Sequence, residues 1–358
     1  MIELRQGNIL KAKADALVNT VNCMGVMGRG IALQFKKAFP EVFNAYESAC
    51  KRGEVTPGMV LVHDLNRFEQ PHYVINLPTK RHWRGKSRIE DIELGLAALV
   101  AEVRRLGIKS VAVPPLGCGL GGLEWRDVRP RIEHAFQALP DVHVLLFEPK
   151  GAPSAEEMAK AERTPNMTEG RAALLGLIRR YLAAVMDPSI TLLEIHKLMY
   201  FMQEAGQKLR LTYAKGPYGP YAENLRHVLT HIEGHFITGY GDASDRPDKQ
   251  IEPKLKAIEA AEEFLADHPK VHEHFNRVSD LIEGFETPVG MELLTTVHWV
   301  ATREEAITVE QAIERTYAWG NRKRMFKEQH IGIAWTTLNR KGWLSIASTE
   351  EAQDADYR

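Results

Sequence analysis

Residues 19–39 read NTVNCMGVMGRGIALQFKKAF, and the fold of the N-terminal half can be inferred outward from them. An apolar run leads into this stretch, Gly25, Gly28 and Gly30 follow within six residues, and a helical pattern comes next. A strand, a glycine loop and a helix N-terminus bring backbone N–H groups together where an anion can bind. The stretch therefore predicts a site for a phosphate-bearing ligand.

The segments around this loop alternate between strand-like and helix-like patterns. Strands are expected at 2–6, 16–21, 59–65, 73–77, 110–116 and 142–147, and helices at 30–52 (broken at Pro40), 87–106 and 126–138. This alternation is typical of a layered α/β fold with a parallel or mixed sheet. A chain of 358 residues also favours two domains over one.

The second half has a different organisation. Residues 151–166 have no strand pattern and are expected to form a linker, and the remaining residues, 167–358, form a mostly helical domain. Residues 174–185 keep a helical period, and Thr191 and Glu194 form a capping-box pattern that opens the next helix. Further helical patterns cover 221–233, 254–267, 270–283, 288–301 and 308–328.

Charge and cysteine content indicate the kind of binding partner and the cellular location. Residues 1–150 carry 21 Lys and Arg against 16 Asp and Glu, whereas residues 151–358 carry 25 against 31. The basic half suggests an anionic ligand or nucleic acid, and the acidic half a basic partner or simply solubility. Three cysteines without CxxC spacing favour a reducing, cytoplasmic location. The sequence has no run of about 18 apolar residues, so no membrane span is expected.

A second glycine loop strengthens the prediction of a ligand site. Residues 113–123 read VPPLGCGLGGL, which again places glycines directly after a strand and before a helix. Loops at the carboxyl ends of parallel strands meet in one crevice, so the two loops could line a diphosphate. Neither matches the P-loop pattern, and no clean GxGxxG is present. The alternative is that both glycine clusters only make tight turns.

These motifs carry a resemblance to a known fold. GNIL at 7–10, ADALVNTVNCMGVMGRGIALQFKKAFP at 14–40 and PPLGCGLGGLEW at 114–125 resemble the macrodomain. The resemblance implies a three-layer α/β/α domain with a mixed sheet over residues 1–150, and a site for ADP-ribose. The form of the first motif is similar to the group that holds terminal ADP-ribose glycohydrolases and DarG-type antitoxins. The implied ADP-ribose contacts are Asn8, Ile9, Thr20, Asn22, Gly28, Arg29, Gly30, Ile31, Pro115, Leu116, Gly117, Cys118, Gly119 and Leu120.

The resemblance gives two asparagines particular roles. Asn8 stands where many macrodomains have an aspartate that accepts from the adenine amino group, and an amide oxygen can do the same. Asn22 matches the asparagine that faces the distal ribose, although capping of a turn is its alternative role. The two glycine loops would hold the diphosphate from opposite sides.

Lys80 is the candidate catalytic residue. It aligns with a lysine implicated in catalysis in the terminal ADP-ribose glycohydrolase group. An amine can attack the anomeric carbon of ribose or stabilise charge as the glycosidic bond breaks, and a nucleophilic amine needs a lowered pKa. Arg81, Arg84 and Lys86 are expected to lower this pKa, whereas a bound diphosphate would raise it. The alternative is a lysine that only pairs with phosphate.

One departure from the group concerns the substrate. Protein-directed glycohydrolases carry an acidic residue where this chain has Gly121, whereas DarG-type macrodomains, which act on ADP-ribosylated thymidine in DNA, resemble this chain there. Cations and an aromatic side chain around Lys80 could hold DNA phosphates and stack a base. The expected DNA-binding residues are Arg81, Trp83, Arg84 and Lys86, with an ordinary basic loop as the alternative.

Metal and thiol chemistry are disfavoured. His227, His231 and His235 recur at every fourth residue, but no acidic or cysteine ligand of suitable spacing completes a zinc site. Cys118 has no expected histidine partner, so a nucleophilic role is disfavoured. We therefore expect no metal and no cofactor.

The second half resembles the Panacea-type antitoxin domain through KL-YF--EAG and KGPYGPY, at 197–206 and 215–221. The glycines and prolines of the latter would fix a loop that presents Tyr218 and Tyr221 to a partner, or merely pack as a turn. The combined prediction is an antitoxin that releases ADP-ribose from single-stranded DNA and binds a DNA ADP-ribosyltransferase toxin. A non-catalytic ADP-ribose reader and a hydrolase of ADP-ribosylated proteins are the alternatives.

Overall fold

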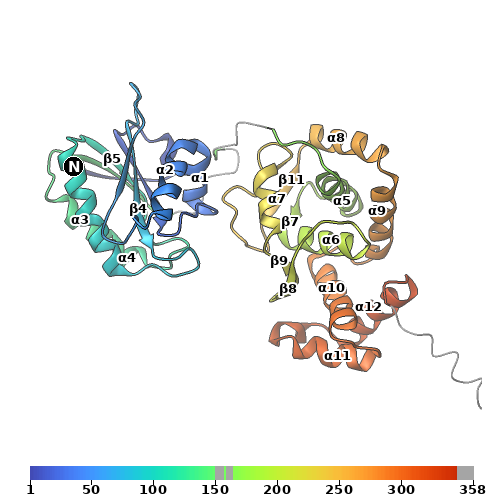
Figure 1. Cartoon of the computed structure of the whole chain (residues 1–358). Helices are drawn as coiled ribbons and strands as arrows, with labels where there is room; N and C mark the ends of the chain where they lie inside the picture. Colours follow the sequence, from blue (N-terminus) through green and yellow to red (C-terminus); the bar gives the residue numbers. More distant parts are fainter. Residues whose placement is uncertain (150–156, 159–163, 345–358) are drawn as a thin grey trace, which may run out of the picture. The chain divides into compact units, whose positions relative to one another are not determined.

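The computed structural model describes residues 1–149, 157–158 and 164–344. It divides into two compact units, one formed by Met1–Arg163 with Gly241–Ser244 and the other by Thr164–Tyr240 with Asp245–Arg358 (Figure 1). Most of the linker predicted at 151–166 lies outside the described residues.

The first unit is built on a six-stranded sheet. Its elements are β1 (Ile2–Arg5), η1 (Ile9–Lys11), β2 (Ala16–Asn22), α1 (Gly30–Ala38), α2 (Pro40–Lys51), β3 (Leu61–Asp64), β4 (Tyr73–Lys80), α3 (Ile89–Arg105), β5 (Ser110–Val113), α4 (Trp125–Phe136) and β6 (His143–Phe147). The strand order is β1-β6-β5-β2-β4-β3, and only the β3–β4 pair is antiparallel. The predicted mixed sheet is confirmed.

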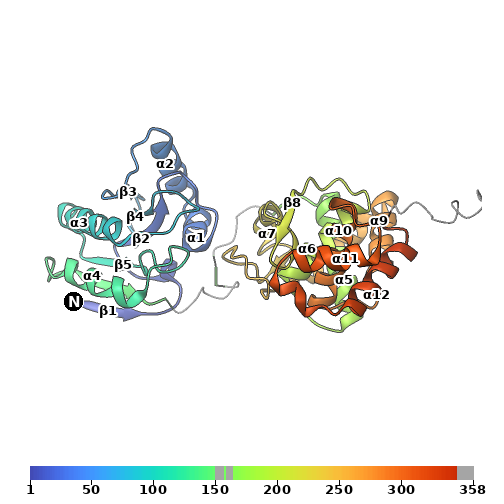
Figure 2. The same cartoon turned by 90° about the horizontal axis from the view of Figure 1, so that it is seen from below.

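Helices cover both faces of this sheet, as Figures 1 and 2 show. On strand β2, Ala16 and Val18 join a core cluster with α3 and α4, whereas Leu17 between them joins a cluster with α1 and α2. Successive strand side chains point to opposite faces, so a strand covered on both sides must be apolar at every position. This explains the continuous apolar runs and confirms the three-layer α/β/α arrangement.

The second unit is mostly helical, as predicted. Its elements are α5 (Glu169–Val185), β7 (Ile190–Thr191), α6 (Leu192–Glu204), β8 (Tyr213–Gly216), β9 (Gly219–Ala222), α7 (Leu225–Ile232), β10 (Ile237–Thr238), β11 (Gln250–Pro253), α8 (Leu255–Ala266), α9 (Pro269–Ile282), α10 (Pro288–Arg303), α11 (Val309–Ala318), η2 (Asn321–Met325) and α12 (Glu328–Arg340). The capping box of Thr191 and Glu194 is present at the start of α6. None of the described helices has both the length and the apolar character that crossing a bilayer requires.

Several boundaries differ from the sequence-based expectation, and three of these differences have a clear physical reason. Strand β4 continues to Lys80 rather than ending at residue 77, because its pairing with β2 continues to Asn22 through a shift in register. The helix expected at 221–233 begins only at Leu225, because residues 219–222 form strand β9 and pair with β8. The helix expected at 308–328 ends at Ala318, before Gly320.

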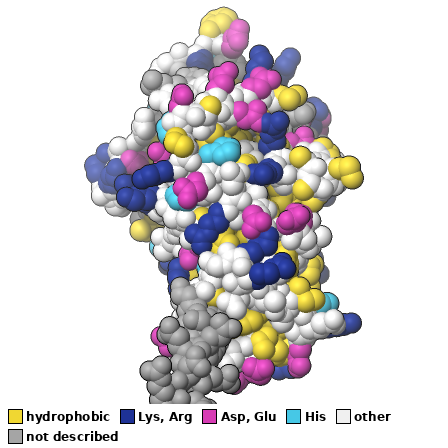
Figure 3. Space-filling view, turned by 90° about the vertical axis from the view of Figure 1, so that its right-hand side faces the viewer, with side chains coloured by type: hydrophobic (Ala, Val, Ile, Leu, Met, Phe, Trp, Pro, Cys, Tyr) yellow, Lys and Arg dark blue, Asp and Glu magenta, His cyan; other side chains and the backbone are white. Residues whose placement is uncertain are grey.

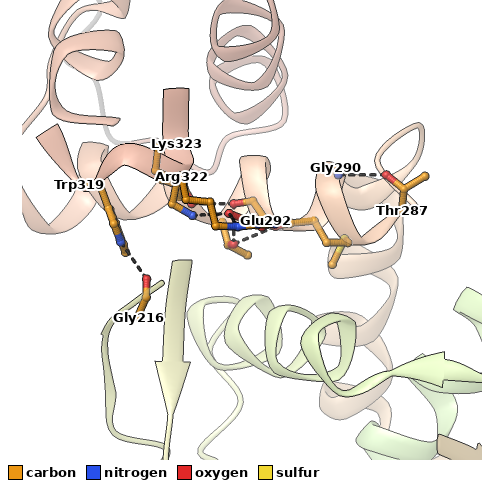
Figure 4. A network of polar contacts seen from close by, with 10 residues as sticks. Gly216, Thr287, Gly290, Glu292, Trp319, Arg322 and Lys323 are labelled. Atoms are coloured by element: carbon orange, nitrogen blue, oxygen red, sulfur yellow. Dashed lines mark hydrogen bonds and ion pairs between the residues drawn. The ribbon is translucent and has the colours of Figure 1, made fainter. Parts of the chain in front are cut away.

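The hairpin of β8 and β9, which carries KGPYGPY, is anchored on several sides. Trp319 Nε1 donates to the Gly216 carbonyl at 2.9 Å, and the buried Lys197 Nζ donates to the Pro220 carbonyl at 2.7 Å. Tyr218 lies beneath the Arg322 guanidinium, which is 4.3 Å from the ring centroid. Figure 4 shows how Arg322 and Lys323 converge on the buried carboxylate of Glu292, at 3.0 and 2.7 Å. The hairpin is therefore a packed element, with Tyr218 half-buried.

Candidate functional site

Three segments meet at the C-terminal ends of strands β2, β4 and β5. Asn22 at the end of β2 pairs in register with Lys80 at the end of β4, and the Cys23 N–H donates to the Lys80 carbonyl at 3.0 Å. A Cβ built on Gly30 would lie 3.6 Å from Leu120 Cδ1 in the second glycine loop. The two glycine loops and Lys80 thus form one site, as parallel strand topology predicts.

The first glycine loop leads into the N-terminus of α1. Helix α1 begins at Gly30, and its N-cap residue, Arg29, makes no side-chain capping hydrogen bond. The backbone φ of Gly30 is 59°, in the left-handed region that favours glycine. The Gly30 N–H already donates to the Asp242 carbonyl at 2.7 Å, so an anion beside Gly28 and Arg29 would meet the remaining N–H groups of this first turn, such as that of Ile31.

The second loop closes on itself. The N–H groups of Cys118, Gly122 and Leu123 donate to the carbonyls of Pro115, Gly119 and Gly117 at 3.1, 3.1 and 3.0 Å. Within the described residues, no hydrogen bond engages the N–H of Gly119 or Leu120. These two donors are oriented by a closed loop and suit a diphosphate. Leu116 is fully buried, and its contact with a ligand stays a prediction.

Asn8, the predicted contact for the adenine end of ADP-ribose, is hydrogen-bonded to main-chain groups. Asn8 caps η1, where its Oδ1 accepts from Leu10 N at 3.0 Å, and its Nδ2 donates to the Glu157 carbonyl at 2.8 Å. The amide oxygen has a second lone pair that could accept from an adenine amino group. Ile9 is buried in the core, and Thr20 is half-buried on β2.

Asn22 is hydrogen-bonded within the first glycine loop. Its Oδ1 accepts from Met24 N at 2.8 Å and its Nδ2 donates to the Val26 carbonyl at 2.5 Å. The Tyr46 hydroxyl donates to the Asn22 carbonyl at 2.6 Å and lies 3.2 Å from Oδ1. The side chain therefore shapes the first glycine loop, which is the turn-capping alternative. Contact with a distal ribose stays a prediction.

Lys80 lies between the two loops. Its Nζ donates to the Leu120 carbonyl, and burial lowers the pKa of the amine below its usual value. The expected lowering by Arg81, Arg84 and Lys86 is wrong, because burial alone accounts for the shift. Arg81 instead makes a bidentate ion pair with Asp91 of α3, at 3.1 and 2.9 Å.

The basic loop after β4 has a stacked arrangement. The His82 and Trp83 rings stack with centroids 5.6 Å apart, and the Arg84 guanidinium lies 4.4 Å from the centroid of the Trp83 ring. Arg84 and Lys86 are exposed. Because Asp91 is 2% exposed and needs a cation partner, a phosphate contact by Arg81 would compete with that pairing. Trp83, Arg84 and Lys86 are therefore better placed for a strand of DNA than Arg81.

Thiol and metal chemistry find little support at this site. Burial, followed by the carboxylates of Glu124 and Asp127, raises the pKa of Cys118 to about 11, so its thiol is protonated at neutral pH. In residues 1–149, 157–158 and 164–344, no three His, Cys, Asp or Glu side chains gather as ligands for a metal ion. The three cysteines are free.

Sequence reasoning missed Ser87. Its side chain is 7% exposed, and its N–H donates to the Gly121 carbonyl at 3.0 Å, which joins the basic loop to the second glycine loop. A serine just before a helical pattern suggests a helix cap, and in fact Arg88 occupies the cap position of α3. No local pattern could show that Ser87 meets a loop more than thirty residues further on.

Comparison with known proteins finds a family match within the first unit. The protein-family model described as Macro domain matches residues 18–132. The solved macrodomain of Mycobacterium tuberculosis DarG is 55% identical, and the match covers 42% of this chain and 99% of that one with a TM-score of 0.42.

Two curated relatives extend the comparison. A DNA ADP-ribosyl transferase-DNA ADP-ribosyl glycohydrolase fusion protein of Thermosipho africanus is 37% identical over 144 residues, which cover 36% of this chain and 37% of the fusion protein. A DNA ADP-ribosyl glycohydrolase of Thermus aquaticus is 46% identical over 354 residues, which cover 99% of this chain and 96% of that protein. With nearly full coverage of both chains, this protein belongs to the DarG family of DNA ADP-ribosyl glycohydrolases, and its N-terminal half is a macrodomain.

Proposed function

We propose that the chain hydrolyses the N-glycosidic bond between ADP-ribose and thymidine in DNA. The observation that carries this proposal is the contact of Lys80 Nζ with the Leu120 carbonyl, between two glycine loops suited to a diphosphate. In the reaction, the hydroxyl of water joins the anomeric carbon, the bond to the base nitrogen breaks, and that nitrogen receives a proton. The chain's three free cysteines suit action in the cytoplasm.

Each part of the site has a task in this reaction. The N-terminus of α1 and the Gly119 and Leu120 N–H groups would hold the diphosphate, which fixes the distal ribose near Lys80. The Lys80 amine acts either as the nucleophile toward the anomeric carbon or as a charge that stabilises the breaking bond. Trp83 and Arg84 would hold the single strand by stacking and charge.

The experiment compares two substrates. The purified chain is incubated with an ADP-ribosylated single-stranded oligonucleotide and, separately, with ADP-ribosylated protein, and free ADP-ribose is measured. Release from DNA but not from protein is expected. Unchanged DNA together with retained ADP-ribose binding would make the chain a reader. Release from protein alone would make it a protein-directed hydrolase.

We also propose that the second unit binds and silences a DNA ADP-ribosyltransferase toxin. Support comes from the Thermosipho africanus relative, whose name couples a DNA ADP-ribosyl transferase to a glycohydrolase in one chain. The charge argument from sequence is weaker than expected, because residues 164–344 carry 22 Lys and Arg against 24 Asp and Glu. Figure 3 accordingly shows basic and acidic side chains interspersed. Four acidic residues of the second half lie at 350–356, outside the described residues.

A fragment of residues 165–358 tests this role without the macrodomain. The fragment has a buried core of its own, so we expect it to fold, which circular dichroism will check. It should co-purify with the toxin and protect cells from it, although it has no hydrolase. Raised salt should slow association if opposite charges attract the two. A folded fragment that neither binds nor protects would leave the competing role, stabilising or dimerising the macrodomain.

A further inference from the structure

Gly121 cannot carry a side chain in this loop. A Cβ built on it would lie 2.2 Å from the Gly117 carbonyl oxygen and 2.3 Å from Ser87 Oγ. The Gly117 oxygen is backbone and already accepts from Leu123 N, so it cannot move aside without opening the loop. The geometry of this loop therefore excludes any side chain at position 121, acidic ones included.

Ser87 holds the other side of the same contact. Its main-chain N–H donates to the Gly121 carbonyl at 3.0 Å, and a Cβ on Gly117 would lie 3.0 Å from Ser87 Cβ. The hydroxyl of Ser87 is buried and has no hydrogen-bond partner among the described residues. The side chain thus acts through packing against Gly117 and Gly121 rather than through its hydroxyl group.

The peptide that this packing fixes is the one that reaches the catalytic lysine. The carbonyl between Leu120 and Gly121 accepts from Lys80 Nζ. The conformation of Gly121 sets the direction of that carbonyl, because both belong to the same peptide unit. Any side chain at position 121 would rotate this peptide and remove the acceptor from Lys80.

We propose that Ser87 and Gly121 are positioning residues for Lys80, because they hold the Leu120 carbonyl at the Lys80 amine. The acceptor is therefore a neutral carbonyl. A carboxylate would favour the protonated amine, whereas a carbonyl orients the amine with a weaker preference for its charged form. Lys80 can therefore lose its proton more readily while it stays in place. This inference relies on the proposed function only for the role of Lys80.

The test reads the environment of Lys80 directly. The full chain is treated briefly with acetic anhydride, and mass spectrometry gives the ratio of acetylation at Lys80 to that at Lys86, which is exposed in the same loop. Gly121→Ala should raise this ratio at least about fivefold, because the amine is released from its acceptor. Turnover of ADP-ribosylated DNA should fall at least about tenfold.

Two further variants keep the result interpretable. Gly332→Ala, in α12, is the matched control, because a Cβ at Gly332 meets only Val309 Cγ2, at 3.9 Å. Its acetylation ratio and its turnover should equal those of the wild type. Ser87→Val keeps the N–H but adds a methyl group against Gly117, and it should change both measurements in the same direction as Gly121→Ala. A cooperative thermal unfolding transition, measured for each variant, will check that the variant is folded.

An unchanged acetylation ratio in folded Gly121→Ala and Ser87→Val variants would overturn the proposal. Normal turnover in both variants would also overturn it. If the wild type releases no ADP-ribose from DNA, the proposed function fails, but the acetylation ratio still tests whether Ser87 and Gly121 position Lys80.

Discussion

Replacing Lys80 with alanine should lower the turnover of ADP-ribosylated DNA by roughly a thousandfold or more. The affinity for free ADP-ribose should fall by less than about tenfold, or about 1.4 kcal/mol. The reason is spatial: Lys80 Nζ contacts the Leu120 carbonyl, whereas the diphosphate donors are main-chain groups of the two loops. Single-turnover kinetics and calorimetry measure the two effects separately.

Two control variants sharpen this result. Lys80→Arg keeps a positive charge but removes the nucleophilic amine, so it should recover turnover only if Lys80 acts electrostatically. Lys51→Ala removes an exposed lysine on α2 that pairs with Glu47, and turnover should be unchanged. Near-normal turnover in Lys80→Ala would show that the catalytic group lies elsewhere.

Replacing Gly119 with glutamate should abolish both ADP-ribose binding and turnover. A Cβ on Gly119 meets no atom within 4 Å, so the side chain fits without unfolding the loop. The added carboxylate would crowd and repel the diphosphate that the Gly119 and Leu120 N–H groups are placed to bind. We expect affinity to fall at least about a hundredfold, or about 2.7 kcal/mol, as measured by calorimetry.

Gly119→Gln separates repulsion from crowding. Its side chain has nearly the same size but no charge, so it should lose less affinity than Gly119→Glu. Raising the salt concentration should narrow the difference between the two variants, because salt screens charge repulsion. Wild-type affinity in Gly119→Glu would mean that the diphosphate does not lie against the second glycine loop.

The order of strands and helices in the first unit follows from local patterns. The apolar runs at 16–21 and 110–113 belong to strands buried on both faces, and each is followed by a glycine loop and a helix. Strand periodicity and the freedom of glycine are properties of neighbouring residues, so the sequence shows them without a structure. The capping box at Thr191 could be predicted for the same reason.

Which side chains meet at the site could not be predicted in this way. Arg81 was expected to lower the pKa of Lys80, but burial does so, and Arg81 pairs with Asp91 on the next helix. Asn22 is hydrogen-bonded within its own loop, and Tyr46 of α2 donates to its carbonyl, a contact that no local pattern indicates. Both outcomes depend on partners brought close by packing.

Sequence alone thus predicts the α/β macrodomain, its two glycine loops, the helical second domain and Lys80 as the candidate reactive group. Only the tertiary structure shows that the Leu120 carbonyl is the acceptor for Lys80, and that Ser87 and Gly117 exclude a side chain at Gly121. The physical reason is that periodicity and glycine content act between neighbours in the chain. Hydrogen bonds and steric exclusion act between neighbours in space, and the folded sheet brings those together from separate loops.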